Sequence, residues 1–345
     1  MSEKLRVGVI GLGVMGADPA RNLAAGVRGA ELAAMSEAIP ERAKAMGEEL
    51  GVPHVYTSGP EMISSGEVDA VIIATPDETH ADLVRAALEA DLAILCEKPL
   101  APTAEEAREL VTLAEAKDKQ LMSMGFMRRF DLGYRTLKAR IDQGVDGALL
   151  MTHSVHRNVS AYPGQDSSAT ITNSAVHEFD IIPWLVGSRI TKVQWTAGRA
   201  TSLLDTRHDP QFVLMHDENG ALHTVQVQVH AQYGYDVRCE VVSERGSAEL
   251  AAVPALVEES PVVVSRDLTR SAPYPADWRP RFADAYRREL QAWVTAALAG
   301  TSPDDAASPR DALQAALIAK AVVDSMNSDS AIVEVESVDE WMAAK

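Results

Sequence analysis

The sequence has few cysteines and far fewer basic than acidic residues. Its two cysteines, Cys96 and Cys239, lie far apart in the chain, so we expect no disulfide and a reducing compartment. Lysine and arginine number 32 against 50 aspartates and glutamates, and the net charge of −18 opposes binding to nucleic acids or anionic membranes. No run reaches the apolar length of a membrane span. The first residues lead directly into a predicted strand, so we expect no signal peptide and a cytoplasmic protein.

The composition is that of a globular protein, with 46% hydrophobic and 24% charged residues. A chain of 345 residues exceeds one ordinary core, so we predict two domains, residues 1–125 and 126–345. The last helices of the second domain are left free to pack back on the first.

Short β-rich runs alternate with helical patterns through the first third of the chain. We predict strands at 6–11, 31–36, 70–74, 93–96 and 120–124, and helices at 14–25, 40–50, 78–90 and 103–117. Thr103 and Glu106 form a capping pattern at the start of the last of these helices. Such alternation predicts an α/β fold with a doubly wound parallel sheet.

The pattern changes after residue 125. We predict a helix at 130–143, a strand at 149–156, a polar loop at 158–172, a helix at 173–186, and closing helices at 280–299 and 309–325. Residues 190–265 resemble antiparallel sheet, with Asn219-Gly220 as a two-residue hairpin turn. We expect the acidic segment 334–340 to be a solvated end.

A Gly-Leu-Gly-Val-Met-Gly sequence begins at Gly11, directly after the first predicted strand. In a G-x-G-x-x-G motif, Gly11 permits the tight turn, Gly13 lets the backbone approach a pyrophosphate, and Gly16 allows close helix packing. The pyrophosphate then lies at a helix N-terminus. This context predicts a dinucleotide site that includes Val14 and Met15.

Glu37 stands where the acidic residue of this motif is expected, at the end of the second strand. A carboxylate there accepts both ribose hydroxyls of NAD and repels a 2′-phosphate. Arg42 leaves NADP open as an alternative, because a nearby arginine can pair with that phosphate.

Glu97-Lys98-Pro99 follows the strand predicted at 93–96. The carboxyl ends of such strands face the ligand crevice of a doubly wound sheet. Pro99 restricts Lys98 to an extended backbone, which fixes the direction of its side chain. A lysine at this place is suited to stabilise a developing alkoxide.

These elements together resemble a known family, the Gfo/Idh/MocA oxidoreductases. The resemblance rests on the glycine loop, on Ala74-Thr75-Pro76 with His80, and on Glu97-Lys98-Pro99. It extends to bacterial inositol 2-dehydrogenases through residues 125–131, 156–158, 176–180, 233–236 and 278–286. It implies a Rossmann domain, then an α/β domain with an open, mainly antiparallel sheet, often in a homotetramer. Cofactor contacts are implied for the glycine loop, Glu37, Ala74, Thr75, Pro76, His80, Glu97 and Lys98.

The resemblance also implies a reaction, the oxidation of myo-inositol to 2-keto-myo-inositol. His177 would take the hydroxyl proton while hydride leaves the same carbon for NAD, and Lys98 would steady the forming oxygen. A neutral imidazole suits general-base catalysis near pH 7. The residues implied to surround the polyol are Arg128, His156, Asn158, Asn173, His177, Asp180 and Tyr235.

Two features depart from the inositol enzymes. They usually carry aspartate four residues before the catalytic histidine, where this chain has Asn173. Asn173 shares a helix face with His177 and can orient it, but it offers no full charge to the imidazolium. Loop 159–172 also differs from the usual pattern. We therefore expect weaker turnover or a different polyol.

Several alternatives stay open. One alternative is a dehydrogenase of another ring: scyllo-inositol, a pyranose or an anhydrosugar such as levoglucosan. The others are an NAD-dependent glycoside hydrolase and a non-catalytic nucleotide-binding regulator. The nine histidines show no metal-binding spacing, so we predict no metal site.

Overall fold

The computed structural model describes residues 4–204, 207–250, 264–266, 269–271 and 274–344. The chain forms two compact units: Met1–Phe130 with Tyr286–Leu313, and Asp131–Ala285 with Gln314–Lys345. The long helices α9 (Trp278–Leu298) and α10 (Pro309–Asn327) each contribute to both units. Among the described residues, no helix is both long and apolar enough to cross a bilayer.

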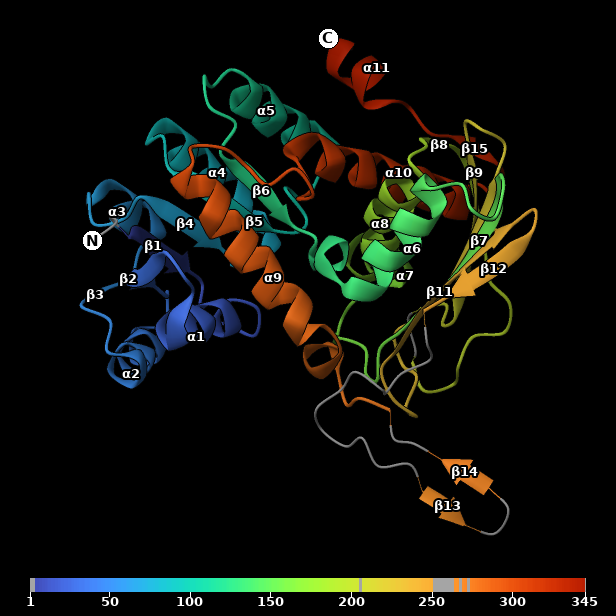
Figure 1. Cartoon of the computed structure of the whole chain (residues 1–345), viewed down its shortest axis with the longest axis horizontal. Helices are drawn as coiled ribbons and strands as arrows, with labels where there is room; N and C mark the ends of the chain where they lie inside the picture. Colours follow the sequence, from blue (N-terminus) through green and yellow to red (C-terminus); the bar gives the residue numbers. More distant parts are fainter. Residues whose placement is uncertain (1–3, 205–206, 251–263, 267–268, 272–273, 345) are drawn as a thin grey trace. The chain divides into compact units, whose positions relative to one another are not determined.

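Six parallel strands form the sheet of the first unit, in the order β3-β2-β1-β4-β5-β6 (Figure 1). They are β1 (Leu5–Ile10), β2 (Ala30–Ser36), β3 (His54–Tyr56), β4 (Ala70–Ile73), β5 (Ala93–Glu97) and β6 (Met122–Gly125). The five strands predicted in this region are all present, and the doubly wound parallel sheet is confirmed. The strand order reverses beside β1, which is where such sheets bind ligands.

Five α-helices and one 3-10 turn connect these strands. They are α1 (Ala17–Gly26), α2 (Pro40–Leu50), α3 (Gly59–Ser64), the turn η1 (Asp77–Thr79), α4 (His80–Glu89) and α5 (Ala104–Glu115). The predicted cap of α5 is present, because the Glu106 N–H donates to Thr103 Oγ1 at 3.2 Å. Val7 and Ile72 of the sheet and Trp293 of α9 belong to one buried apolar cluster. The short elements β3 and α3 were not predicted.

Seven strands form the main sheet of the second unit, in the order β12-β11-β7-β10-β9-β8-β15 (Figure 1). They are β7 (Leu149–Arg157), β8 (Ile190–Thr196), β9 (Gln211–Asp217), β10 (Leu222–Gln228), β11 (Asp236–Ser243), β12 (Gly246–Glu249) and β15 (Val333–Glu334). Every neighbouring pair is antiparallel except β7 and β10, which run parallel. The mainly antiparallel sheet is therefore confirmed, as a mixed sheet. A separate pair joins β13 (Val264–Arg266) to β14 (Thr269–Ser271).

Helices cover one face of this sheet (Figure 1). They are α6 (Leu132–Asp142), α7 (Ser167–Ala169), the π-helix η3 (Thr170–Ala175) and α8 (Val176–Val186). Along β9, Val213 and Met215 are fully buried, while Phe212 and Leu214 are half-buried on the opposite face. The helix predicted at 173–186 is present, but its first turn belongs to the π-helix η3 and the rest to α8.

Two details of the second unit correct the sequence analysis. The hairpin between β9 and β10 is present, but its turn is not two residues long: the Asp217 N–H bonds to the Ala221 carbonyl, which leaves residues 218–220 in the loop. Gly220 takes a φ of +88°, as the left-handed end of a three-residue loop requires. The acidic end is also not a simple solvated tail, since it forms β15 and the capped helix α11 (Val338–Ala343).

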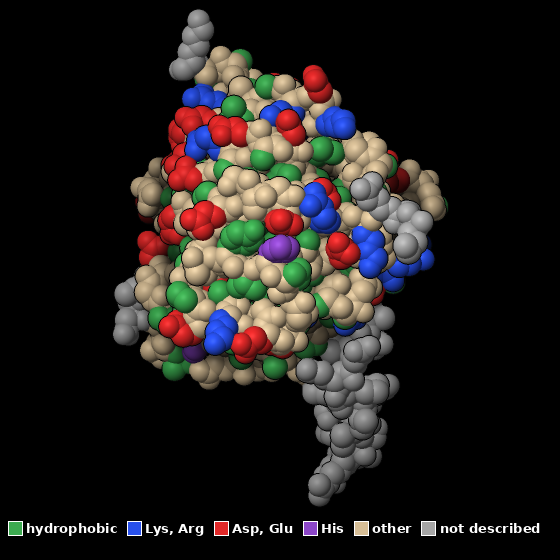
Figure 2. Space-filling model, turned by 90° about the vertical axis from the view of Figure 1, so that its left-hand side faces the viewer, with side chains coloured by type: hydrophobic (Ala, Val, Ile, Leu, Met, Phe, Trp, Pro, Cys, Tyr) green, Lys and Arg blue, Asp and Glu red, His purple; other side chains and the backbone are tan. Residues whose placement is uncertain are grey.

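The chain has 50 acidic against 32 basic residues, and many acidic side chains are visible on the face drawn in Figure 2. Acidic side chains lie among basic ones on this face, and hydrophobic side chains appear between them in small groups (Figure 2). On this face the acidic side chains are therefore not gathered into one continuous patch.

Candidate functional site

The glycine loop joins β1 to α1 and is closely packed at both ends. Gly11 has a φ of +87°, and a Cβ there would lie 2.5 Å from the Ala74 carbonyl oxygen. A Cβ on Gly16 would lie 1.8 Å from the Gly11 carbonyl oxygen. The fold itself therefore requires glycine at both positions.

Gly13 stands in open space between them. A Cβ at Gly13 would meet no heavy atom within 4 Å, so the packing of the protein does not require glycine there. Val14 beside it is 55% exposed. A bare backbone at the N-terminus of α1 fits the pyrophosphate of a dinucleotide, which needs close approach to N–H groups.

Glu37 follows the last residue of β2 and is 7% exposed. Its carboxylate accepts the Leu12 N–H at 3.0 Å and the Ile39 N–H at 3.1 Å, and Arg42 Nη1 lies 3.5 Å away. The residue predicted to bind the ribose thus also ties the glycine loop to the end of β2. Arg42 is committed in part to this carboxylate, and its role toward a 2′-phosphate stays a prediction.

The loops that follow β4 and β5 lie side by side because these strands are parallel neighbours. Ala74, Thr75 and Pro76 form the first loop, and Lys98 and Pro99 belong to the second. His80, at the start of α4, is 0% exposed, and its ring nitrogens face carbonyl oxygens of both loops. Its predicted cofactor contact remains a prediction, and its ring atoms are engaged within the protein.

Glu97 at the end of β5 sits over Gly125 of the adjacent strand β6. A Cβ on Gly125 would lie 3.1 Å from the Glu97 carboxyl, so glycine makes room for this side chain. Burial raises the pKa of Glu97 to about 7, and the charge of Lys98 opposes that shift. Arg128, in the 3-10 helix Met127–Phe130 that follows β6, is 1% exposed.

A cluster of aromatic and acidic side chains lies inside the second unit. Nδ1 of His156, on β7, lies 2.9 Å from Oε2 of Glu178, on α8. The His156 ring centroid is 6.2 Å from that of His177 and 6.4 Å from that of Tyr235. Three of the residues predicted to bind the polyol are therefore brought together, and Asp180 is buried on the same helix.

Asn173 lies in the π-helix that precedes α8, four residues before His177. Its side chain is partly buried, as is that of His177. Single π-helical turns inside α-helices occur frequently at functional sites. The relation between these two side chains stays a prediction.

Asn158 and Tyr235 mark two chain segments that meet at the end of β7. The Asn158 N–H donates to the Gln228 carbonyl at 2.9 Å, and its own carbonyl accepts the Ala231 N–H at 2.8 Å. Tyr235 is 4% exposed and packs edge-on against Phe282. The predicted residues Asn158 and Tyr235 are thus on segments joined by backbone hydrogen bonds.

Two functional candidates were missed from the sequence. Glu178 is 0% exposed, and a carboxylate within the apolar run of α8 was the signal available for it. Arg157 braces the segment before Tyr235, because Nη1 donates to the Tyr233 hydroxyl at 2.6 Å, which donates to Asp236 at 2.7 Å. The sequence placed Arg157 in a motif but gave it no role.

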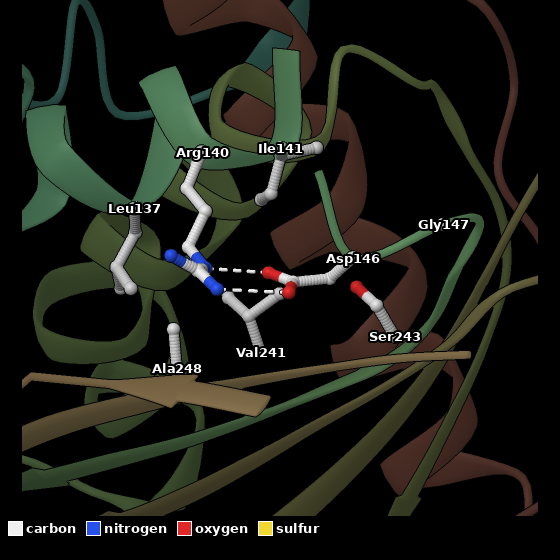
Figure 3. Close-up of a pocket in the computed structure, with 8 residues that line it drawn as sticks. All are labelled: Leu137, Arg140, Ile141, Asp146, Gly147, Val241, Ser243 and Ala248. Carbon is white, nitrogen blue, oxygen red and sulfur yellow. Dashed lines mark hydrogen bonds and ion pairs between the residues drawn. The ribbon is translucent and has the colours of Figure 1, made fainter. Parts of the chain in front are cut away.

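A small cavity lies away from these residues, between α6 and the strands β11 and β12 (Figure 3). Its volume of about 10 Å³ holds at most one water molecule. Arg140 and Asp146 form an ion pair across it (Figure 3). This cavity is too small for a polyol and shares no residue with the candidate site.

A loop that fits a dinucleotide in one unit and a buried histidine–carboxylate–tyrosine cluster in the other define a dinucleotide-dependent oxidoreductase. Two protein-family models match the chain. The NAD-binding Rossmann fold of the oxidoreductase family matches residues 5–126, and the C-terminal alpha/beta domain of the same family matches residues 138–335. The chain belongs to the Gfo/Idh/MocA oxidoreductase family, as its motifs predicted.

Relatives match along nearly the whole chain. Inositol 2-dehydrogenase 2 of Paenarthrobacter aurescens is 46% identical, covering 96% of this chain and 98% of the relative. Inositol 2-dehydrogenase 1 of Saccharopolyspora erythraea is 41% identical, covering 97% of each. The crystal structure of myo-inositol dehydrogenase from Lactobacillus casei with NAD(H) and myo-inositol aligns with a TM-score of 0.90 at 30% identity, covering 96% of this chain and 97% of that one.

Proposed function

We propose that this protein is an NAD-dependent dehydrogenase that oxidises a ring hydroxyl of a cyclic polyol, with myo-inositol as the leading substrate. The observation that carries the proposal is the cluster formed by the buried residues His156, Glu178 and Tyr235 with the partly buried His177. Such donors and acceptors match the many hydroxyls of a polyol, and relatives that align over the whole chain are named for inositol.

In this proposal the protein's own groups move one proton and hold one oxygen. His177 accepts the hydroxyl proton as general base while the C–H bond of the same carbon breaks, with its electron pair leaving as hydride. Lys98 donates a hydrogen bond to the oxygen as it becomes a carbonyl. NAD⁺ supplies the hydride acceptor when bound.

The remaining predicted residues bind and orient. Asn173 orients His177, and the polyol is held by Arg128, His156, Asn158, Asp180 and Tyr235. The dinucleotide is held by Gly11, Gly13, Val14, Met15, Gly16, Glu37, Ala74, Thr75, Pro76, Glu97 and Lys98. The open space at Gly13 and the buried carboxylate of Glu37 support this assignment.

A second candidate is a dehydrogenase of another ring, such as scyllo-inositol, a pyranose or levoglucosan. Asn173 in place of aspartate favours it, as does the difference in loop 159–172. The scyllo-inositol dehydrogenase of Lactobacillus casei, solved with NAD(H) and scyllo-inositol, aligns with a TM-score of 0.87 at 27% identity, over 96% of this chain and 99% of that one.

We also propose a cytoplasmic homotetramer. Phe212 and Leu214 are half-buried on the sheet face opposite α6 and α8, and such apolar side chains favour pairing with a second copy. The paucity of cysteine is consistent with a reducing compartment. Light scattering on the purified chain gives the mass of the assembly, and a monomer would contradict the tetramer.

The test of function is the absorbance at 340 nm with purified protein, NAD⁺ or NADP⁺, and a panel of myo-, scyllo- and D-chiro-inositol, glucose, xylose and levoglucosan. NADH formation with myo-inositol supports the leading proposal, and formation with another ring alone supports the second. No NADH with any of them, while NAD⁺ still binds, favours a glycoside hydrolase or a regulator.

A further inference from the structure

We propose that His80 is a positioning residue that fixes Lys98 relative to the loop Ala74-Thr75-Pro76. The inference rests on the proposed function, since it takes from it the role of Lys98 and the cofactor contacts of that loop. It assigns to His80 an indirect role, through the backbone, in place of direct contact with the dinucleotide.

The geometry places one ring between two loops. His80 Nδ1 lies 2.7 Å from the carbonyl oxygen of Pro99, and Nε2 lies 3.0 Å from the carbonyl oxygen of Thr75. The ring is 0% exposed, so no solvent competes for either bond. One rigid side chain therefore spans the ends of the neighbouring strands β4 and β5.

The chemistry of the two contacts sets what a substitute must provide. A carbonyl oxygen only accepts, so each bond needs a hydrogen on the facing nitrogen, and the ring makes both bonds together only when both nitrogens carry one. A buried carbonyl that loses its donor is left without a hydrogen bond, which is unfavourable. Loss of the ring donors therefore releases the loops rather than leaving them in place.

The N-terminal end of α4, which carries His80, is itself held in place. Thr79, directly before His80, donates from Oγ1 to the Pro76 carbonyl at 2.8 Å, and its Oγ1 lies 2.7 Å from Thr75 Oγ1, from which it can accept. Leu83 on the next turn of α4 is buried in the core. The ring thus starts from an anchored helix end and reaches the residue that follows Lys98.

The test compares two variants with a matched control. His80→Phe keeps a ring without donors, and His80→Gln keeps a single amide donor group. His54→Gln is the control, because the His54 side chain in β3 is 41% exposed and its ion pair is with Glu67, whose side chain is 43% exposed. Three quantities are measured: NAD⁺ affinity by fluorescence, kcat with its deuterium isotope effect at the reacting carbon, and hydrogen exchange of residues 75–79 and 97–101.

We expect kcat of His80→Phe to fall on the order of 100-fold, as for a displacement of about 1 Å. The isotope effect on kcat should rise because hydride transfer becomes slower than release, while NAD⁺ affinity changes less than about threefold. His80→Gln should lie between, and both loops should exchange faster in each variant than in the control.

A folded variant with normal kcat and isotope effect would overturn the inference. So would a large loss of NAD⁺ affinity with kcat unchanged, which would mean direct cofactor contact. If the wild type forms no NADH with any polyol, the proposed function fails, and hydrogen exchange still decides whether His80 joins the two loops. If His80→Phe does not fold, the same three quantities are measured for His80→Gln and compared with the control.

Discussion

Glu178 holds His156 through a hydrogen bond of 2.9 Å between Oε2 and Nδ1, with the two side chains 1% and 4% exposed. A carboxylate only accepts, so Nδ1 carries the hydrogen and the lone pair of the neutral ring lies on Nε2. His156 is thereby set in one tautomer, and its ring lies beside those of His177 and Tyr235.

Glu178→Gln is expected to raise KM for the polyol about tenfold while changing kcat less, because the amide can donate or accept and no longer fixes the tautomer. Steady-state kinetics with myo-inositol measure both parameters. Glu249→Gln in β12, where the side chain is exposed, is the control and should leave both unchanged. An unchanged KM in folded Glu178→Gln would refute the assigned role.

Glu97 should make stability depend on pH. Burial raises its pKa from 4.5 to about 7, so the folded state retains a proton that the unfolded state has lost. This contribution to stability is full below about pH 4.5 and is lost as pH rises to about 7. The glutamine of Glu97→Gln does not titrate, so the Tm of the variant relative to that of the wild type should increase as pH rises across that window. A constant difference in Tm would contradict the raised pKa.

Two glycines of the same loop should respond differently to alanine. Gly16→Ala should destabilise the protein by several kcal/mol, because its Cβ would overlap the Gly11 carbonyl oxygen. Gly13→Ala should unfold at the wild-type temperature yet bind NAD⁺ at least tenfold more weakly, since its Cβ occupies space meant for the pyrophosphate. Calorimetry and NAD⁺ titration separate the two effects; equal losses of Tm would count against this interpretation.

Asn173→Asp restores the charge that the inositol enzymes usually carry. A carboxylate near His177 favours the imidazolium, so kcat should rise several-fold and the acid limb of the pH–rate profile should move to higher pH. Initial rates across the pH range with the preferred polyol test this. If neither the rate nor the pH profile changes, Asn173 does not act through His177.

Local signals were sufficient for the first unit and for half of the site. The glycine loop, Glu37 and Glu97-Lys98-Pro99 each follow a strand whose apolar run is visible in the sequence. Their side chains therefore had to fall at one edge of a parallel sheet. The short elements β3 and α3 gave no periodic signal because they are too brief for one.

The remaining features depend on contacts between segments that are far apart in the sequence. Nothing in residues 149–157 indicates that β7 runs parallel to β10, since that pairing depends on segments far along the chain. The π-helix before α8 has no sequence code of its own, and the contact of Glu178 with His156 depends on the position of β7 beside α8. Tertiary contacts, not residue propensity, decided these features.

The last strand of the second sheet has a protective consequence. Val333 pairs with Val193 of β8, and the Val335 N–H bonds to the Thr191 carbonyl at 2.8 Å. A chain ending before residue 333 would leave the backbone groups of β8 open to the strands of other molecules. Residues 333–335 therefore cover part of the edge of β8, and their removal should increase the tendency of the protein to aggregate.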